Sequence, residues 1–132
     1  MCSVGDENQS ETKYRLEIEL PGIPKTINAL GSSKHWRVVQ QHNLKWKRDV
    51  MLACRQKEPK APLKKCTITY TRFSSRYPDF DNLVNSFKVV QDGLVLAKII
   101  ENDSMAVIHD PKYCFEKCKQ KEARITIIVE AL

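Results

Sequence analysis

Asp79 and Asp81 stand two residues apart, just before an apolar helical pattern that starts at Leu83. In extended backbone, side chains two residues apart point to the same side, so these two carboxylates can converge on one point. Converging carboxylates are a usual way to hold Mg²⁺, a hard cation that prefers oxygen ligands. The pair therefore predicts a metal site, and the competing interpretation is capping and charge in the first helical turn.

A third carboxylate, Asp103, lies in the polar stretch 101–104, directly after two isoleucines. If the chain returns there to the start of the helix, Asp103 would complete the metal site. The metal would then activate a water molecule and offset charge on a phosphate. The competing interpretation of Asp103 is an ordinary turn residue.

Lys88 is the candidate cation of this site. Asp81, Asn85, Lys88 and Asp92 follow one another at i, i+4, i+7 and i+11, which places them on the polar face of a helix. The long stem of Lys88 could reach a phosphate near the metal. The alternative is a lysine that is simply solvated on a polar face.

Charge and composition favour a polyanionic partner. The 132 residues carry 22 basic and 16 acidic side chains, a formal net charge of +6, and nucleic acid is the commonest partner of a basic domain. Charge alone does not separate DNA from RNA or from a membrane surface. No stretch approaches the ~20 apolar residues of a membrane span, and residues 1–13 lack the apolar core of a secretion signal. We therefore expect a cytoplasmic protein.

Two other chemistries are weaker interpretations. Cys114 and Cys118, with His109 upstream, could suggest zinc, but their spacing departs from the common C-x₂-C pattern and no second pair follows. No nucleophile elbow and no glycine-rich nucleotide loop is present. The five cysteines, an odd number, predict reduced thiols without a structural disulfide.

The spacing of hydrophobic residues along the chain predicts the helices and strands that position these side chains. Residues 1–12 read as a disordered lead, and residues 13–132 as one domain. Alternating apolar residues predict strands over 14–20, 66–73 and 124–130, and a fourth over 105–108.

Helical spacing of apolar residues predicts one helix over about 34–56 and a second from Asp79 or Asp81 to near Ala97. The order is β-α-β-α-β-β, an α/β (α+β) fold with one sheet, mixed or antiparallel, and two main helices. Five basic residues in or beside the first helix are candidates for contact with a DNA backbone: Lys34, Arg37, Lys45, Lys47 and Arg48.

With these residues in view, the sequence resembles the RusA-like Holliday-junction resolvases, small dimeric endonucleases of phage and prophage origin. The closest match is the run from Pro78 to Lys88, which is similar to the D-x-D-N-L pattern and the helix that follows it. Asp92-Gly93-Leu94-Val95 and the acidic turn that ends at Ser104 continue the match, and a looser one includes Pro24, Asn28 and His35-Trp36.

The resemblance spans roughly residues 14–130. It implies a mixed α/β fold, a homodimer in a bacterial cytoplasm, and paired symmetric cuts at four-way DNA junctions in recombination and repair. It also implies that Asp79, Asp81 and Asp103 bind Mg²⁺, with Mn²⁺ as an alternative metal, and that Lys88 is the catalytic lysine.

The sequence departs from the family pattern at two positions. Asn85 stands where some members have the lysine, and Asn102 stands where the acidic turn often has its first aspartate. The alternative functions are a branched-DNA-binding module without catalysis and a metal-dependent nuclease that acts on flaps or RNA.

Overall fold

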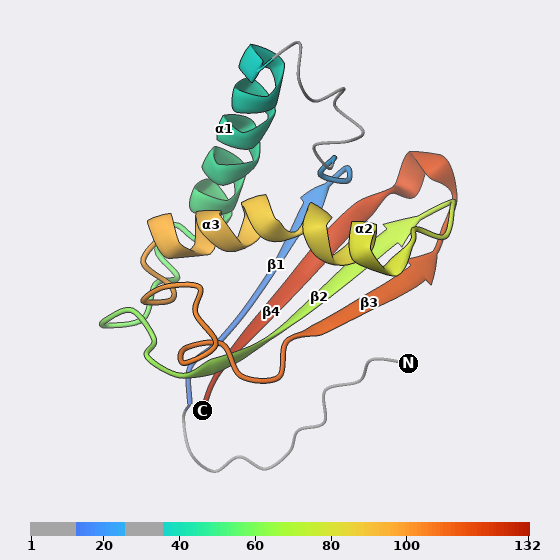
Figure 1. Ribbon diagram of the computed structural model, residues 1–132. Coiled ribbons are helices and arrows are strands. Elements are labelled where there is room, and N and C mark those ends of the chain that lie inside the picture. Colours follow the sequence, from blue (N-terminus) through green and yellow to red (C-terminus); the bar gives the residue numbers. More distant parts are fainter. Residues whose placement is uncertain (1–12, 26–35) are drawn as a thin grey trace.

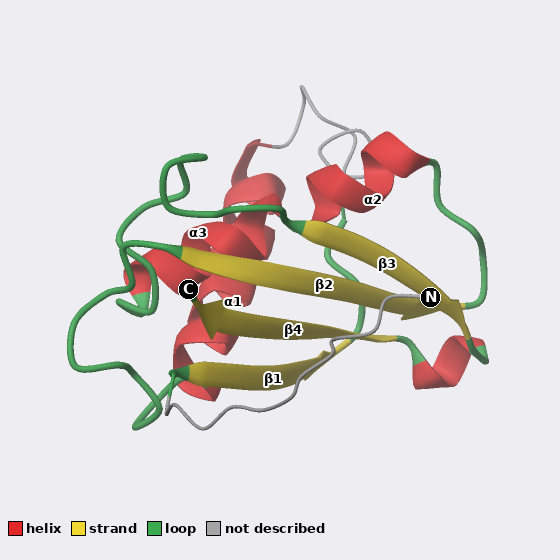
Figure 2. Ribbon diagram, turned by 90° about the horizontal axis from the view of Figure 1, so that it is seen from below, coloured by secondary structure: helices red, strands yellow, loops and turns green. Residues whose placement is uncertain are grey.

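The computed structural model describes residues 13–25 and 36–132, and these residues build one four-stranded sheet with helices on one of its faces (Figures 1 and 2). The alternation of buried and exposed residues in the first strand is strict, as expected for a strand with one face on the core. The strands are β1 (Arg15–Pro21), β2 (Cys66–Ser74), β3 (Lys112–Lys117) and β4 (Arg124–Ala131).

The sheet is mixed, with the strand order β1-β4-β2-β3. β4 pairs antiparallel with both β1 and β2, whereas β2 and β3 are parallel. A parallel pair needs a crossover, because the chain must return to the same end of the sheet before the second strand begins. Here the crossover contains α2 (Phe80–Ser86) and α3 (Lys88–Leu96).

The helices α1 (Trp36–Ala53) and α3 cover the same face of the sheet and pack on each other. Trp46 and Val50 are the buried residues of α1. Gly93 of α3 lies so close to α1 that a Cβ atom built on it would stand 2.8 Å from the Cβ of Val50. The absence of a side chain at Gly93 therefore permits the close approach of the two helices.

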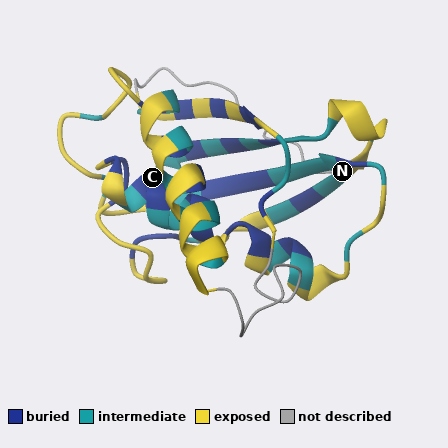
Figure 3. Cartoon of the chain, turned by 90° about the horizontal axis from the view of Figure 1, so that it is seen from above, coloured by how far each residue is buried: buried dark blue, intermediate teal, exposed yellow. Residues whose placement is uncertain are grey.

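The core lies between the helices and the two central strands (Figure 3). β4 contributes Ile125, Ile127 and Val129, all fully buried, and β2 contributes Ile68 and Tyr70. These are the residues that alternation in the sequence predicts for the inward face, so the predicted α+β architecture is confirmed.

Two predicted elements need correction. The second helix is not continuous, because a turn at Phe87 divides it into α2 and α3. Residues 105–108 form turns with one isolated bridge between Cys66 and Ile108, and the third strand is Lys112–Lys117 instead. Val107 and Ile108 are buried in the crossover loop. Buried apolar residues in a loop give the same pattern in sequence as a short strand does. A short 3₁₀ helix, Gln120–Glu122, was not predicted.

Within the described residues no helix has both the length and the apolar character that crossing a membrane requires. The predicted lead over 1–12 and the candidate DNA contact Lys34 lie outside the residues that the structure describes.

The cysteines are only partly as predicted. Cys54 and Cys66 are buried free thiols in the core. The prediction that all cysteines are reduced is wrong at Cys114, which is disulfide-bonded and therefore not available as the zinc ligand considered above.

Candidate active site

The two carboxylates of the D-x-D-N-L run lie at the start of α2, and both residues are exposed. Asp79 occupies the N-cap position in extended backbone, yet its side chain makes no capping hydrogen bond. Asp81 accepts a hydrogen bond at Oδ1 from the backbone N–H of Asn82, at 3.0 Å. The carboxylate of Asp79 therefore does not have the capping role that was the competing interpretation of its sequence position.

Lys88, the first residue of α3, joins two carboxylates. Its Nζ donates to Oδ1 of Asp92 at 3.0 Å and to Oδ2 of Asp103 at 3.1 Å. Asp92 is one turn further along α3, while Asp103 belongs to the loop that follows α3. The acidic turn thus returns to α3 at Lys88, whereas the sequence-based hypothesis places Asp103 at the start of the helix beside Asp79 and Asp81, which belong to the start of α2.

The loop that carries Asp103 is fixed by its neighbours on both sides. Ile99 and Ile100 are buried, and the backbone of Leu63 pairs with that of Ile99 and Glu101. After Asp103, the backbone N–H of Ser104 donates to Oδ1 of Asn102 at 2.9 Å. Asn102, one of the two departures from the family pattern, thus stabilises the turn, which is a common use of Asn.

The charges of this cluster stabilise each other. The hydrogen bond from Lys88 to Asp92 raises the pKa of Lys88 most, and the hydrogen bond to Asp103 raises it further. The hydrogen bond from Lys88 lowers the pKa of Asp103. Lys88 is therefore a cation at neutral pH, suited to bind a phosphate or an anionic leaving oxygen and not to act as a base.

A buried tyrosine on β2 is hydrogen-bonded to a residue of α3 between Lys88 and Asp92. The hydroxyl group of Tyr70 donates to Oε1 of Gln91 at 2.7 Å. Burial raises the pKa of Tyr70 well above its usual value, so its hydroxyl group stays neutral. The sheet is thereby linked to the helix that carries Lys88.

The structure brings some predicted residues together and leaves others apart. Lys88 and Asp103 are in contact, and Asp92 joins them. Over residues 13–25 and 36–132, no group of three or more His, Cys, Asp or Glu side chains is placed to hold a metal ion. Asp79, Asp81 and Asp103 thus do not form a closed metal cage.

The chemistry of the donor set still fits Mg²⁺. This ion keeps several waters and is commonly bound through one or two protein carboxylates plus phosphate oxygens. Asp79 and Asp81 are both exposed and stand two residues apart, so they can supply the one or two carboxylates that this requires. Asp103 shares one of its oxygens with Lys88 and would join a metal only through its other oxygen or by releasing the lysine.

Sequence reasoning did not assign Asp92, Gln91 or Tyr70 to the site. The spacing of Lys88 and Asp92 at i and i+4 is a recognisable ion-pair signal and could have identified Asp92. Nothing local in the sequence could have identified Tyr70, since it reaches the site from a strand 21 residues before Gln91.

The predicted DNA contacts on α1 do not all share one side of the helix. Lys45 and Lys47 are two residues apart, which places them roughly 160° apart around the helix axis, whereas Arg37 and Arg48 nearly coincide. Lys45 is paired with Asp49 at 2.7 Å, and its Nζ lies 4.7 Å from the centroid of the Trp46 ring. Arg37 and Arg48 are exposed and are the better placed of the four described candidates.

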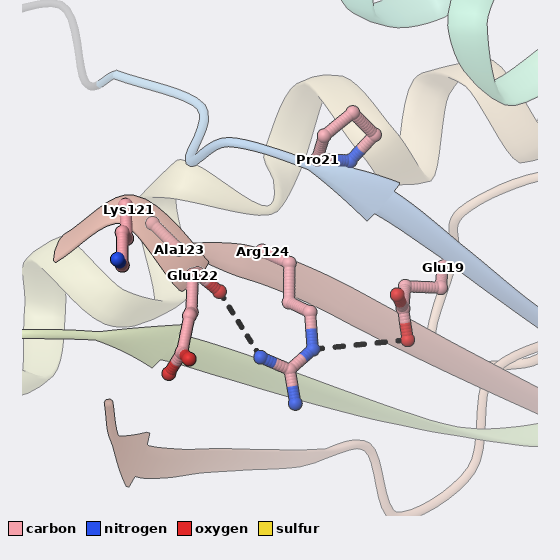
Figure 4. Close-up of a pocket in the computed structure, with 6 residues that line it drawn as sticks. All are labelled: Glu19, Pro21, Lys121, Glu122, Ala123 and Arg124. Carbon is pink, nitrogen blue, oxygen red and sulfur yellow. Dashed lines mark hydrogen bonds and ion pairs between the residues drawn. The ribbon is translucent and has the colours of Figure 1, made fainter. Parts of the chain in front are cut away.

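Two surface hollows lie away from this cluster. One is next to the start of β4, where Arg124 donates to the carbonyl of Glu122 and pairs with Glu19 (Figure 4). The other lies between the C-terminal ends of α1 and α3 and includes Arg48. Neither is lined by Asp79, Asp81, Lys88 or Asp103.

A scan against protein-family models and a comparison with curated proteins both found no match to this chain.

Proposed function

We propose that this protein is a Mg²⁺-dependent endonuclease that cuts four-way DNA junctions. The observation that carries the proposal is the contact between Lys88 and Asp103 at 3.1 Å. The sequence predicts catalytic roles for both residues, which lie 15 positions apart on different elements. The helix that carries Lys88 is in turn joined to the sheet by the hydrogen bond from Tyr70 to Gln91.

In the proposed site Asp79, Asp81 and Asp103 are the residues that would hold the metal. When bound, Mg²⁺ would supply an activated water and neutralise charge on the scissile phosphate. Lys88, whose pKa is raised by its hydrogen bond to Asp92, is the cation that stabilises the phosphate or the leaving oxygen. Tyr70 orients Gln91, which lies between Lys88 and Asp92 on α3.

The remaining parts of the proposal concern substrate and assembly. Arg37 and Arg48, which share one side of α1, are the proposed contacts to the DNA backbone. A homodimer would place two sites about a two-fold axis, as paired symmetric cuts require. We place the protein in a bacterial cytoplasm as a phage or prophage product, on the resemblance to RusA-like resolvases alone.

The test is cleavage of an end-labelled synthetic four-way junction in the presence of Mg²⁺, repeated with Mn²⁺. Wild-type protein should give paired nicks. Asp81→Asn should lower cleavage by roughly a hundredfold or more, the scale of losing one electrostatic contact in an active site, while junction binding is kept.

A matched control is Asp110→Asn. Asp110 is exposed, lies outside the cluster and has a positive φ of 49°, a conformation that asparagine adopts readily. This variant should cut like the wild type. Equal cleavage by Asp81→Asn and wild type would remove Asp81 from the site.

A second candidate function, a branched-DNA-binding module without catalysis, is favoured by one observation. Lys88 already pairs with both Asp92 and Asp103, and the described part of the chain contains no three-acid metal group. Junction binding by pure protein without metal-dependent cleavage would establish this function. Parallel assays with a flap, a duplex and an RNA hairpin would identify a nuclease of another specificity.

A further inference from the structure

Two exposed aromatic rings stand three residues apart beside the candidate site. Tyr77 is 75% exposed and Phe80 is 72% exposed, whereas the rings of Tyr70, Phe87 and Trp46 are buried. Single exposed apolar residues are normal on a protein surface. Two large exposed rings in one short segment are a candidate binding surface, because exposed apolar groups that gather on a surface commonly mark one.

The ring of Tyr77 is held in place although most of it is open to solvent. It packs on Phe115 of β3, with ring centroids 4.8 Å apart and planes tilted by 44°. Nζ of Lys117 lies 5.6 Å from the Tyr77 centroid. A ring that is already ordered loses little conformational entropy when a ligand stacks on it.

Basic residues lie near the Tyr77 ring, where β2 and β3 end side by side. Lys117 pairs in register with Ser74, and the N–H of Cys118 donates to the carbonyl of Ser74, which brings the segment 117–119 beside the segment 74–77. Arg76, Lys117 and Lys119 are all exposed.

Three acidic residues are also near, and their positions matter. Glu116 alternates with Phe115 and Lys117 in β3, so its side chain leaves from the opposite face of the strand. Asp79 lies between Tyr77 and Phe80 in the chain, and Asp81 follows Phe80, where the proposed metal would bind. Lys117, whose Nζ is near the Tyr77 ring, is therefore the cation that a phosphate beside this ring would meet.

From this arrangement we infer that Tyr77 and Phe80, with Arg76, Lys117 and Lys119, form a binding surface for unpaired nucleotides of single-stranded DNA. Every base has a flat face that can stack on an aromatic ring, and cations beside the rings bind the backbone. In a duplex the base faces are covered by neighbouring pairs, so only an unpaired or splayed base can reach the rings.

The inference goes beyond the proposed cleavage and does not require a metal. We would measure binding of a fluorescently labelled 20-nucleotide oligothymidine by anisotropy, at low salt and with EDTA. Tyr77→Ala and Phe80→Ala should each weaken binding by about tenfold, the scale of losing one stacked base. Tyr77→Phe keeps the ring and should bind within about twofold of the wild type.

The matched control is Leu44→Ala, which removes another exposed apolar side chain (58% exposed) on α1. It should leave oligothymidine binding unchanged, and thermal unfolding should show that all variants are folded. Wild-type-like binding by both alanine variants, or no binding by the wild type, would overturn the inference. Failure of junction cleavage would not, because no outcome of the EDTA assay depends on a metal.

Discussion

At the scale of single residues, the site is organised around one cation. Lys88 is exposed, and the sequence alone allows it to be a solvated lysine. The structure gives it two carboxylate partners on different elements, Asp92 and Asp103. The same contacts that keep Lys88 protonated also keep Asp103 ionised, so the pair is a charged unit over the whole neutral range.

The pH dependence of this pair can be predicted with its sign. The pKa of Asp103 is lowered in the folded state, so its contribution to stability is present above the unfolded value and is lost as the pH falls through the folded value. The contribution of Lys88, whose pKa is raised, is lost only as the pH rises through that raised value. Both side chains are more than a third exposed, so screening limits the pair to below about 1 kcal/mol.

The measurement is an NMR titration of the Asp103 carboxyl carbon. In Lys88→Met the pKa of Asp103 should rise relative to the wild type, because the main cause of its lowering is gone. Lys45→Met removes a lysine that pairs with Asp49 and serves as control, with no change at Asp103. An unchanged pKa of Asp103 in Lys88→Met would show that the ion pair does not form in solution.

The buried thiols give a second prediction at this scale. Burial raises the pKa of both Cys54 and Cys66 to about 11. At pH 8 only roughly one thiol in a thousand would then be the reactive thiolate. A thiol reagent should label Cys118, which is partly exposed, well before Cys54 or Cys66, as mapped by peptide mass spectrometry. Labelling of all three at equal rates would contradict the burial of these two thiols.

At the scale of elements, the break at Phe87 determines how the site is assembled. The N–H of Phe87 bonds to the carbonyl of Val84 at 3.1 Å, and the helical pattern resumes when Gln91 bonds to the carbonyl of Phe87 at 2.9 Å. The Phe87 ring is buried and packs on Tyr70, with centroids 4.9 Å apart. Lys88 thus begins a new helix and no longer belongs to the same continuous helix as Asp81.

The contact of α3 with α1 predicts the effect of Gly93→Ala. Alanine favours a helix over glycine by about 1 kcal/mol, which alone would stabilise the protein. The added Cβ would clash with Val50, and overpacking of a core costs roughly 1–3 kcal/mol. We expect a net loss of about 1 kcal/mol in the free energy of unfolding, measured by urea denaturation.

The control is a double-mutant cycle with Val50→Ala, which keeps the Cβ of Val50 but removes its two methyl groups, at 3.1 and 3.2 Å from the new Cβ. Gly93→Ala should cost less in the Val50→Ala background than in the wild type. A stabilising effect of Gly93→Ala in the wild type would mean that the two helices are further apart than in the structure.

At the scale of the whole molecule, helices cover one face of the sheet and the net charge is +6. If DNA lies along α1, binding should release counterions and weaken with salt. For a junction substrate, Arg37→Gln should make the negative slope of the logarithm of the binding constant against log salt shallower by about 1. The slope is measured by binding titrations at several salt concentrations.

Arg15→Gln is the matched control for this slope, because it removes one charge from β1, where Arg15 already pairs with Glu17 and Glu130. It should leave the slope nearly unchanged. Equal slopes for Arg37→Gln and the wild type would place the DNA elsewhere on the molecule.

Local pattern in the sequence was sufficient for the elements whose burial repeats regularly. Alternation identified β1, β2 and β4 to within one residue at each end, and the apolar spacing of Trp46 and Val50 identified the buried side of α1. The residues with candidate chemistry could also be selected locally, since Asp79 and Asp81 are neighbours in sequence. These features depend on contacts within a few residues, which a periodic pattern records.

Only the tertiary structure decided the rest. The location of β3 depends on hydrogen bonds to β2, some 40 residues earlier in the chain, and its own sequence alternates weakly. The pairing of Lys88 with Asp103 depends on where the crossover loop is buried. The spacing of hydrophobic residues indicates which residues are buried. Packing and hydrogen bonding across the whole fold determine which distant segments meet.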